Sequence, residues 1–131
     1  MIVPDEILKF KFDDVYHGFA ECTGLLKLKE DCIFIEYIVK DSILGVIKSN
    51  VKSFEISYKN IIEAELINKL FTKKLIIKLK SLAGLQDFPA GDIGEISIQL
   101  KRDGNSLSIA QSMFSFINLK VAELKLAQYD Y

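Results

Sequence analysis

The end of the chain carries the pattern that most constrains the fold, an amphipathic helix predicted from Asn105 to about Leu124. Its apolar side chains recur at alternating steps of three and four residues, which places them on one stripe of a helix. The stripe comprises Leu107, Ala110, Phe114, Ile117, Val121 and Leu124, widened by Ile109, Met113 and Phe116. Asn105, Ser106 and Ser108 are all suitable N-caps. Because so broad an apolar face is unstable in water, the rest of the chain must supply a layer that covers it.

The residues from Phe19 to Val39 alternate as two β-strands joined by a tight turn at Glu30-Asp31. Pairing across that turn brings eight residues onto one face of the hairpin. The predicted pairs are Leu28 with Ile33, Leu26 with Ile35, Gly24 with Tyr37, and Cys22 with Val39. The same register places Cys22 and Cys32 on opposite faces and far apart along the hairpin, so we expect two free thiols.

A second hairpin is predicted between residues 62 and 80, around a four-residue loop at residues 69–72. Apolar residues alternate with acids in its first strand and with lysines in its second. The predicted pairs are Leu79 with Ile62, Ile77 with Ala64, and Leu75 with Leu66. On the outer face Lys78 falls opposite Glu63, a cross-strand pair of a kind that stabilises a hairpin by about 0.2–1 kcal/mol.

The remaining strand-like segments are residues 7–12, 43–48, 51–57 and 95–101. The middle two are either one broken strand or two short ones. Residues 82–94 form the longest segment without a period. Six or seven antiparallel strands followed by one helix predict a mainly β fold with a C-terminal α-helix. Since strands that are apolar on one face need closure or a cover, we expect the sheet to form a partly open barrel that the helix caps.

The length of 131 residues fits a single domain, with its core at about residues 19–124, an N-terminal segment 1–18 and a tail 125–131. The formal net charge of −1, from 17 Lys+Arg and 18 Asp+Glu, argues against a nucleic-acid-binding protein. No stretch approaches the roughly 18 apolar residues of a transmembrane helix. The first residues also lack the basic start and apolar core of a signal peptide. We therefore expect a cytoplasmic protein without a transmembrane segment.

Residue sets for catalysis or metal binding are scarce in this sequence. His17 is its single histidine, which argues against a Ser-His-Asp triad and a histidine-rich metal site. The two cysteines lack a CxxC spacing, and neither of the phosphate-binding patterns GxxxxGK(S/T) and GxGxxG occurs. Neighbouring acids lie on predicted strands and turns, where carboxylates are ordinarily solvated. We expect no catalytic activity, no metal and no cofactor.

The order of elements, strands throughout and then one amphipathic helix, resembles the pleckstrin-homology (PH) superfold, in particular small bacterial PH-like and GRAM-like domains. The segments that carry the resemblance are Gly24-Leu25-Leu26-Lys27-Leu28, Ile56-Ser57-Tyr58-Lys59-Asn60-Ile61 and Lys101-Arg102-Asp103-Gly104. The resemblance implies a partly open antiparallel barrel of seven strands in two near-orthogonal sheets, capped by the C-terminal helix. It also implies a binding function, toward phosphoinositides, peptides or protein partners, because members of this superfold are rarely enzymes.

Phosphoinositide-binding members of the superfold carry several basic residues around the first hairpin loop. Here the tip of that loop is Glu30-Asp31, flanked only by Lys27 and Lys29. Headgroup recognition needs several cations that converge, because each exposed lysine contributes only about 1 kcal/mol near an anionic surface. We therefore expect phosphoinositide binding to be weak or absent.

Two other segments are candidate contact surfaces. The first is a set of lysines on one strand face, Lys74, Lys78 and Lys80. It is either a solvated outer face or a contact for an anionic lipid headgroup or a nucleic-acid backbone. The second is a set of apolar loop residues, Leu85, Phe88 and Ile93. It is either a packed connection or a surface for a protein partner.

These observations predict a non-catalytic PH-like binding or assembly module that contacts protein partners or a second copy of itself. The alternative is a domain that binds a small ligand or a lipid headgroup in a pocket at the barrel mouth. Tyr16, His17 and Tyr58 would be the polar groups of that pocket. A cavity lined by these residues would favour the alternative, and a filled barrel would exclude it.

Overall fold

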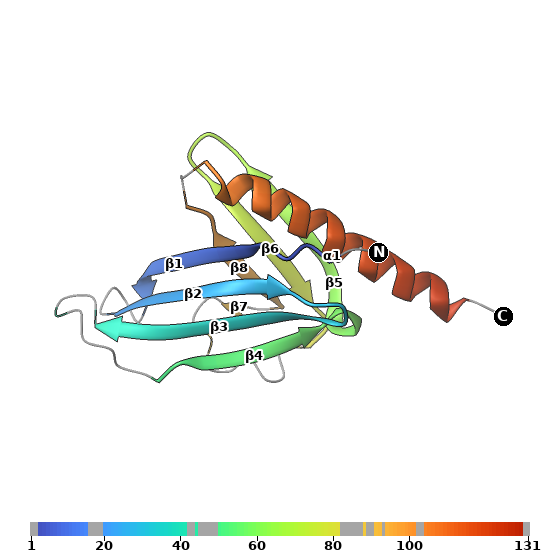
Figure 1. Cartoon of the computed structure of the whole chain (residues 1–131), viewed down its shortest axis with the longest axis horizontal. Coiled ribbons are helices and arrows are strands. Elements are labelled where there is room, and N and C mark those ends of the chain that lie inside the picture. The colour runs from blue at the N-terminus through green and yellow to red at the C-terminus, as the bar shows by residue number, and fades with distance from the viewer. Residues whose placement is uncertain are drawn as a thin grey trace.

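The computed structural model describes residues 3–15, 20–41, 44, 50–81, 88, 91–92, 94–101 and 104–129 (Figure 1). Its elements in chain order are β1 (Ile7–Val15), β2 (Ala20–Leu28), β3 (Cys32–Asp41), β4 (Lys52–Ser57), the 3₁₀ turn η1 (Tyr58–Asn60), β5 (Ile61–Asn68), β6 (Lys73–Leu79), β7 (Gly91–Asp92), β8 (Glu95–Gln99) and α1 (Ser106–Gln128). The prediction of a mainly β fold with a C-terminal helix is confirmed. The described strands number eight rather than six or seven, because the two-residue β7 pairs with β8.

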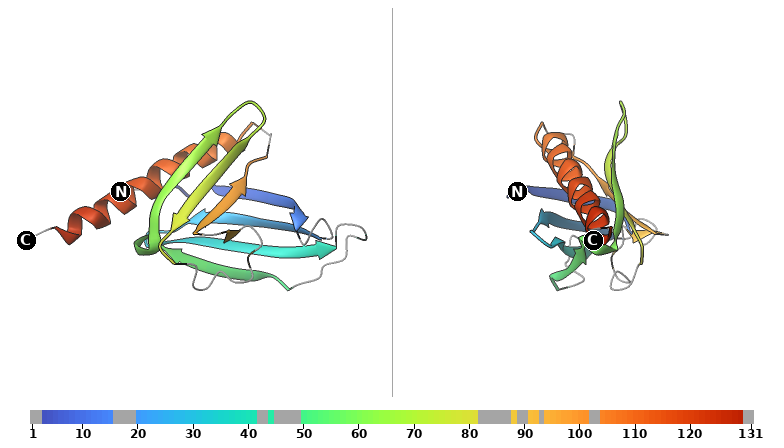
Figure 2. Two further views of the ribbon diagram at one scale, coloured as in Figure 1. Left: turned by 180° about the vertical axis from the view of Figure 1, so that it is seen from behind. Right: turned by 90° about the vertical axis from the view of Figure 1, so that its right-hand side faces the viewer.

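The strands form two antiparallel sheets, ordered β1-β2-β3-β4 and β5-β6-β8-β7. Figure 2 shows that the strands of the second sheet run steeply across those of the first. In the part of the chain that the structure describes, the two sheets do not close into a barrel. The helix α1 packs on β5, β1 and η1, so it covers the open side between the sheets, as an apolar stripe on a C-terminal helix requires.

All four predicted residue pairs of the β2–β3 hairpin are present. They are Leu28–Ile33, Leu26–Ile35, Gly24–Tyr37 and Cys22–Val39. Cys22 is buried, Cys32 is half-buried, and both are free thiols as predicted. The alternation of apolar and polar side chains is therefore sufficient to set this register, because a slip by one residue would expose every apolar side chain.

Strand β1 pairs with β2 at the edge of the first sheet. It runs beyond the predicted residues 7–12 to Val15. Its Leu8 and Phe10 are fully buried. The packed part of the chain therefore starts well before residue 19, and it extends at the other end as α1 continues to Gln128.

The β5–β6 hairpin has the predicted register near its turn and departs from it at the start of β5. Three predicted pairs are present, namely Ala64–Ile77, Leu66–Leu75 and Glu63–Lys78. Leu79, however, lies opposite Ile61 rather than Ile62, because the register shifts between Ile61 and Glu63. Ile61 is consequently buried and Ile62 is 43% exposed. A bulge of this kind cannot be recognised from alternation alone, since two adjacent isoleucines fit either face.

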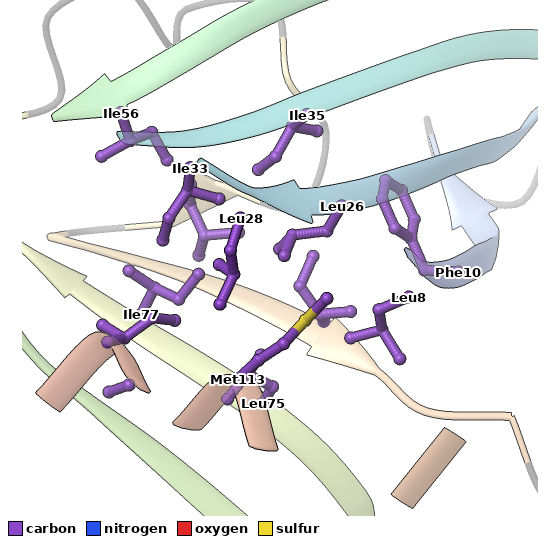
Figure 3. Packing of buried hydrophobic residues seen from close by; sticks show 14 of the residues in the cluster. Leu8, Phe10, Leu26, Leu28, Ile33, Ile35, Ile56, Leu75, Ile77 and Met113 are labelled. Atoms are coloured by element: carbon purple, nitrogen blue, oxygen red, sulfur yellow. The ribbon is translucent and has the colours of Figure 1, made fainter. Parts of the chain in front are cut away.

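Both sheets and the helix contribute to one hydrophobic core (Figure 3). Its largest fully buried side chains include Leu8, Phe10, Leu26, Leu28, Ile33, Ile35, Ile61, Leu75, Ile77, Ile96, Ile98 and Met113. In Figure 3 the side chains of the first sheet point toward those of β6 and toward Met113 of α1. The space between the layers that the figure shows is thus occupied by apolar side chains.

The buried stripe of α1 is rotated relative to the predicted one. Met113 and Ile117 are fully buried, whereas Phe114 is half-buried at the edge of the core. The helix begins after Asn105, which is the N-cap and makes no side-chain capping hydrogen bond. Because α1 packs between two sheets, Met113 and Phe116, two of the three residues that widened the predicted stripe, are buried in the core, and Ile109 is half-buried.

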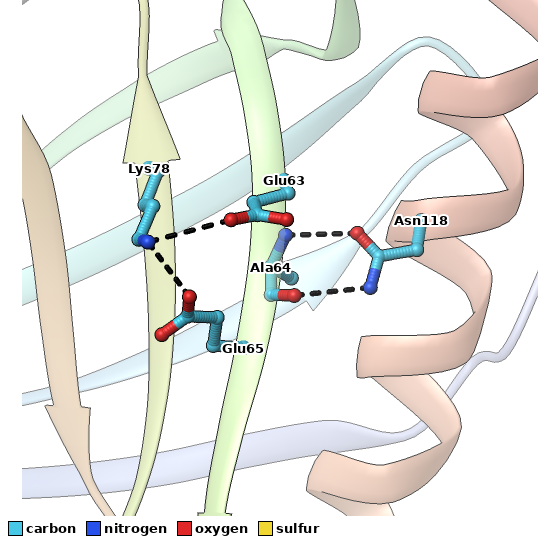
Figure 4. A network of polar contacts seen from close by, with 5 residues as sticks. All are labelled: Glu63, Ala64, Glu65, Lys78 and Asn118. Carbon is cyan, nitrogen blue, oxygen red and sulfur yellow. Dashed lines mark hydrogen bonds and ion pairs between the residues drawn. The ribbon is translucent and has the colours of Figure 1, made fainter.

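Asn118 fastens α1 to the edge of the second sheet (Figure 4). Strand β5 is an edge strand, whose outward backbone groups need partners. The Asn118 side-chain oxygen accepts a hydrogen bond from the Ala64 N–H at 2.8 Å, and its nitrogen donates to the Ala64 carbonyl at 3.0 Å. One side chain therefore replaces two hydrogen bonds of a neighbouring strand and positions the helix along β5.

Candidate functional site

Phe88, expected on an apolar contact loop, lies in the core instead. Its side chain is 4% exposed. Its ring packs edge-to-face against Tyr37 and Phe54, at centroid distances of 5.0 and 5.2 Å, and against Phe10 at 6.0 Å. Phe88 is thus a core residue, which corrects its assignment to a partner-binding surface. Leu85 and Ile93 lie outside the described residues, so a contact through them stays a prediction.

The three lysines of the predicted anion contact do not converge. The Lys78 Nζ lies 2.7 Å from Glu65 Oε1 and 3.3 Å from Glu63 Oε1 (Figure 4). Hydrogen bonds to Glu65 and then to Glu63 raise the pKa of Lys78 above its ordinary value. Lys74 and Lys80 are six residues apart along extended chain, about 20 Å. The Lys78 charge is therefore neutralised within the sheet, while Lys74 lies near the start of β6 and Lys80 follows its end.

A polar cluster beside the β2–β3 turn joins Cys32, Glu55 and Lys29. The Cys32 thiol donates a hydrogen bond to Glu55 Oε2 at 2.7 Å, and the Lys29 Nζ lies 3.6 Å from the same oxygen. Burial, and then the hydrogen bond to Glu55, raise the pKa of Cys32 to about 11. The thiol is therefore protonated at neutral pH and is a weak nucleophile. Glu55 also offsets the Lys29 charge, in addition to the acidic residues of the turn.

Tyr58 is the described member of the polar set expected at a barrel mouth, while Tyr16 and His17 lie outside the described residues. Tyr58 is 2% exposed, and its hydroxyl donates to the Lys29 carbonyl at 2.7 Å. A hollow of about 410 Å³ lies between Tyr58, the start of β5, Lys80 and the last turns of α1. An adjacent hollow of about 630 Å³ is lined by charges of both signs, from Glu30, Asp31, Lys59, Lys120 and Glu123. The bonded hydroxyl and the mixed charges do not build a convergent ligand site.

The turn between β5 and β6 carries the two most exposed large apolar side chains of the described chain. Leu70 is 82% exposed and Phe71 is 78% exposed. The Lys69 N–H donates to the Thr72 carbonyl at 2.8 Å, which closes the turn. Figure 1 shows this turn projecting beyond the rest of the second sheet. We refer to residues 69–72 as the hairpin tip. Turns ordinarily hold Gly, Asn, Asp, Ser or Pro, so an exposed Leu-Phe pair serves neither the turn nor the core.

A hollow of about 320 Å³ lies beside the hairpin tip, between the start of β6, the end of β8 and the start of α1. It is lined by Leu70, Phe71, Lys73, Gln99, Leu100, Lys101, Gly104 and Leu107. The Leu100 N–H donates to the Lys73 carbonyl at 2.9 Å and so holds the base of the hairpin against the chain that leads to the helix. Among the described residues of this lining there are two lysines and no acid, so these residues together carry positive charge.

Four lysines lie on or beside the hairpin tip, namely Lys69, Lys73, Lys74 and Lys101. The ion pairs among the described residues involve other lysines, and none joins these four to an acid. The sequence feature that could have indicated this basic surface is the segment of residues 66–86. It contains five lysines and no acidic residue, in a chain of net charge −1. The alternation of apolar and polar residues does not reveal this surface, because Leu70 and Phe71 fall in a loop and belong to no periodic pattern.

Other kinds of site find no support in the described ranges. No group of three or more His, Cys, Asp or Glu residues in them is placed to hold a metal ion. Nor do they contain a helix that is both long and apolar enough to cross a membrane. Comparison of the chain with protein-family models, with curated proteins and with solved structures found no match.

Proposed function

We propose that the protein is a non-catalytic binding module of PH-like architecture. A sheet of four strands, a second antiparallel sheet and a C-terminal helix follow the order that the resemblance implies. The chemistry of the described polar residues supports a non-catalytic role. The Cys32 thiol is protonated at neutral pH, and the Tyr58 hydroxyl is bonded to the backbone.

The hairpin tip is the proposed contact surface, and the exposure of Leu70 and Phe71 is the observation that carries the proposal. Burial of a Leu or Phe side chain contributes about 1.5–3 kcal/mol, so an adjacent pair supplies the apolar centre of an interface. The strands are paired up to Asn68 opposite Lys73. Because the backbone is already ordered there, binding loses little conformational entropy at the tip.

The test is sedimentation of the protein in extracts of its own cells, compared with the variant Leu70→Ser/Phe71→Ser. The matched control is Leu126→Ser/Tyr129→Ser, which alters two side chains that are each 71% exposed near the end of α1. We expect the wild type and the control to sediment with a partner, well ahead of a 14.9 kDa monomer. The tip variant is expected at the monomer position.

Two results would contradict this proposal. One is a tip variant that sediments with the partner as the wild type does, and the other is a wild type that is monomeric in the extract. Melting temperatures of all three proteins exclude a folding defect. They should agree closely, because the four altered side chains are exposed and contribute little to the core.

A further inference from the structure

We propose that the hairpin tip docks on an anionic lipid surface, with Leu70 and Phe71 inserted at the headgroup level and lysines held against the lipid charges. This inference rests on the proposed function, since it names the partner of the same tip. It also specifies the mode of recognition. Binding follows the net charge of the membrane and does not depend on one kind of headgroup.

The shape of the tip suits a membrane interface. The two further views in Figure 2 show the β5–β6 turn as a narrow projection of the second sheet. Leu and Phe side chains partition into the boundary between headgroups and acyl chains. Because the turn projects from the sheet, Leu70 and Phe71 can reach this boundary without a rearrangement of the sheet. The hydrogen bond from the Lys69 N–H to the Thr72 carbonyl satisfies backbone groups that would otherwise resist leaving water.

The charge around the tip complements an anionic surface. Lys69 and Lys101 are exposed, and Lys73 and Lys74 are half-buried, so all four can keep their charged ends in the headgroup layer while their stems cover apolar surface. Each lysine near an anionic bilayer strengthens binding about fivefold. The nearby acids Glu63 and Glu65 lie on β5 at a greater distance along the strand from the tip, and both form ion pairs with Lys78.

The same arrangement disfavours selection of one headgroup. The four lysines come from the turn, from the start of β6 and from the chain after β8, and they flank an apolar apex instead of converging on one pocket. The first hairpin offers no substitute, because the Lys29 charge is offset by Glu55 at 3.6 Å. A phosphoinositide is therefore expected to act only through its additional negative charge.

The absence of tryptophan from the chain allows a direct assay. Phe71→Trp places a single fluorescent reporter at the tip, and Tyr129→Trp places one at the end of α1 as the matched control. The vesicles contain phosphatidylcholine alone, phosphatidylcholine with phosphatidylserine, or phosphatidylcholine with a phosphoinositide at equal total charge. We expect a blue shift of the Phe71→Trp emission with both anionic vesicles, no shift with phosphatidylcholine alone, and no shift of the control.

Vesicle co-sedimentation of the otherwise unmodified chain measures the contributions of the two kinds of residue. Leu70→Ser/Phe71→Ser should weaken binding at least tenfold. Lys69→Gln/Lys73→Gln/Lys74→Gln should weaken it about a hundredfold, the product of three fivefold terms, and should remove most of its salt dependence. Leu126→Ser/Tyr129→Ser should bind as the wild type does.

The remaining outcomes separate this inference from the proposed function. If no anionic vesicle binds the wild type while the tip variant still loses its partner in cell extracts, the partner is a protein and the lipid inference is wrong. If the tip variant loses neither vesicles nor partner, both proposals are wrong. Tighter binding to the phosphoinositide than to phosphatidylserine at equal charge overturns the unselective mode. Binding that survives the lysine substitutions overturns the electrostatic part.

Discussion

At the scale of single residues, Asn118 shows how one polar side chain can position a whole element. Its amide satisfies both the N–H and the carbonyl of Ala64, the two groups that a neighbouring strand would otherwise bind. Half-buried polar groups left without partners cost about 1–3 kcal/mol each when water cannot replace the bond fully. The same contact blocks the edge of β5 against pairing with another chain.

Asn118→Ala is therefore expected to lower the free energy of unfolding by about 2 kcal/mol, because it leaves both Ala64 groups unpaired. Chemical denaturation of the variant measures the effect. Ser115→Ala, at an exposed position one turn earlier on α1, is the control and should change stability by less than about 0.5 kcal/mol. Equal stabilities of the two variants would mean that the bidentate contact contributes nothing.

Lys78 gives a prediction about alkaline pH. Its hydrogen bonds to Glu65 and Glu63 raise its pKa above the ordinary value of 10.5. A raised pKa in the folded state stabilises the fold below pH 10.5, and that contribution is lost as the pH rises through the folded-state pKa. The Lys78 amine, followed by NMR, should titrate at lower pH in Glu63→Gln/Glu65→Gln than in the wild type. Identical titration curves would contradict the pairing.

At the scale of elements, the hairpin registers were predictable wherever apolar and polar residues alternate strictly. The pairing of Leu28 with Ile33 across the β2–β3 turn is an example. Prediction failed where two apolar neighbours fit either face, as at Ile61 and Ile62, because only the observed bulge decides between them. The helix was predictable from its period, but the centre of its buried stripe was not. That centre depends on how α1 is seated between two sheets, which is a tertiary property.

Gly24 occupies a position in the first sheet that leaves no space for a side chain. A methyl group added there would fall on the Glu36 carbonyl oxygen, 2.6 Å from the Phe10 ring and 2.9 Å from the Tyr37 Cβ. Gly24→Ala should thus lower the free energy of unfolding by about 1–3 kcal/mol or more, since backbone must move. Gly104→Ala, whose added methyl would meet nothing within 4 Å, is the matched control. Similar melting temperatures for the two variants would contradict the packing described.

The rotation of the buried stripe of α1 changes the order in which two of its residues, Met113 and Phe114, are expected to contribute to stability. Met113 is fully buried, so Met113→Ala should cost about 2–5 kcal/mol. Phe114 is half-buried at the edge of the core, so Phe114→Ala should cost only about 1–2 kcal/mol. Denaturant titrations of both variants give the order. A larger loss for Phe114→Ala would place the predicted stripe, and not the observed one, in the core.

At the scale of the whole molecule, the arrangement of sheets and helix could be predicted from the sequence, whereas the proposed contact surface could not. Covering an apolar helix with one-sided strands leaves few architectures, which is why the mainly β fold with a C-terminal helix was predictable. Residues of a contact surface need not follow the patterns of polarity and turn preference by which a sequence specifies its fold. Leu70 and Phe71 sit in a turn that favours polar residues, while Phe88, in an irregular segment, is buried. Periodicity carries no information about either position.

Amide hydrogen exchange with and without phosphatidylserine-containing vesicles tests most directly whether the molecule uses the hairpin tip as its contact surface. Docking through the tip should slow exchange at residues 69–73, and at residues 99–101 and 104–107 beside the adjacent hollow, and should leave the rest of the described chain unchanged. Protection at the β2–β3 turn near Glu30, or beside the last turns of α1, with unchanged exchange at the tip, would contradict it.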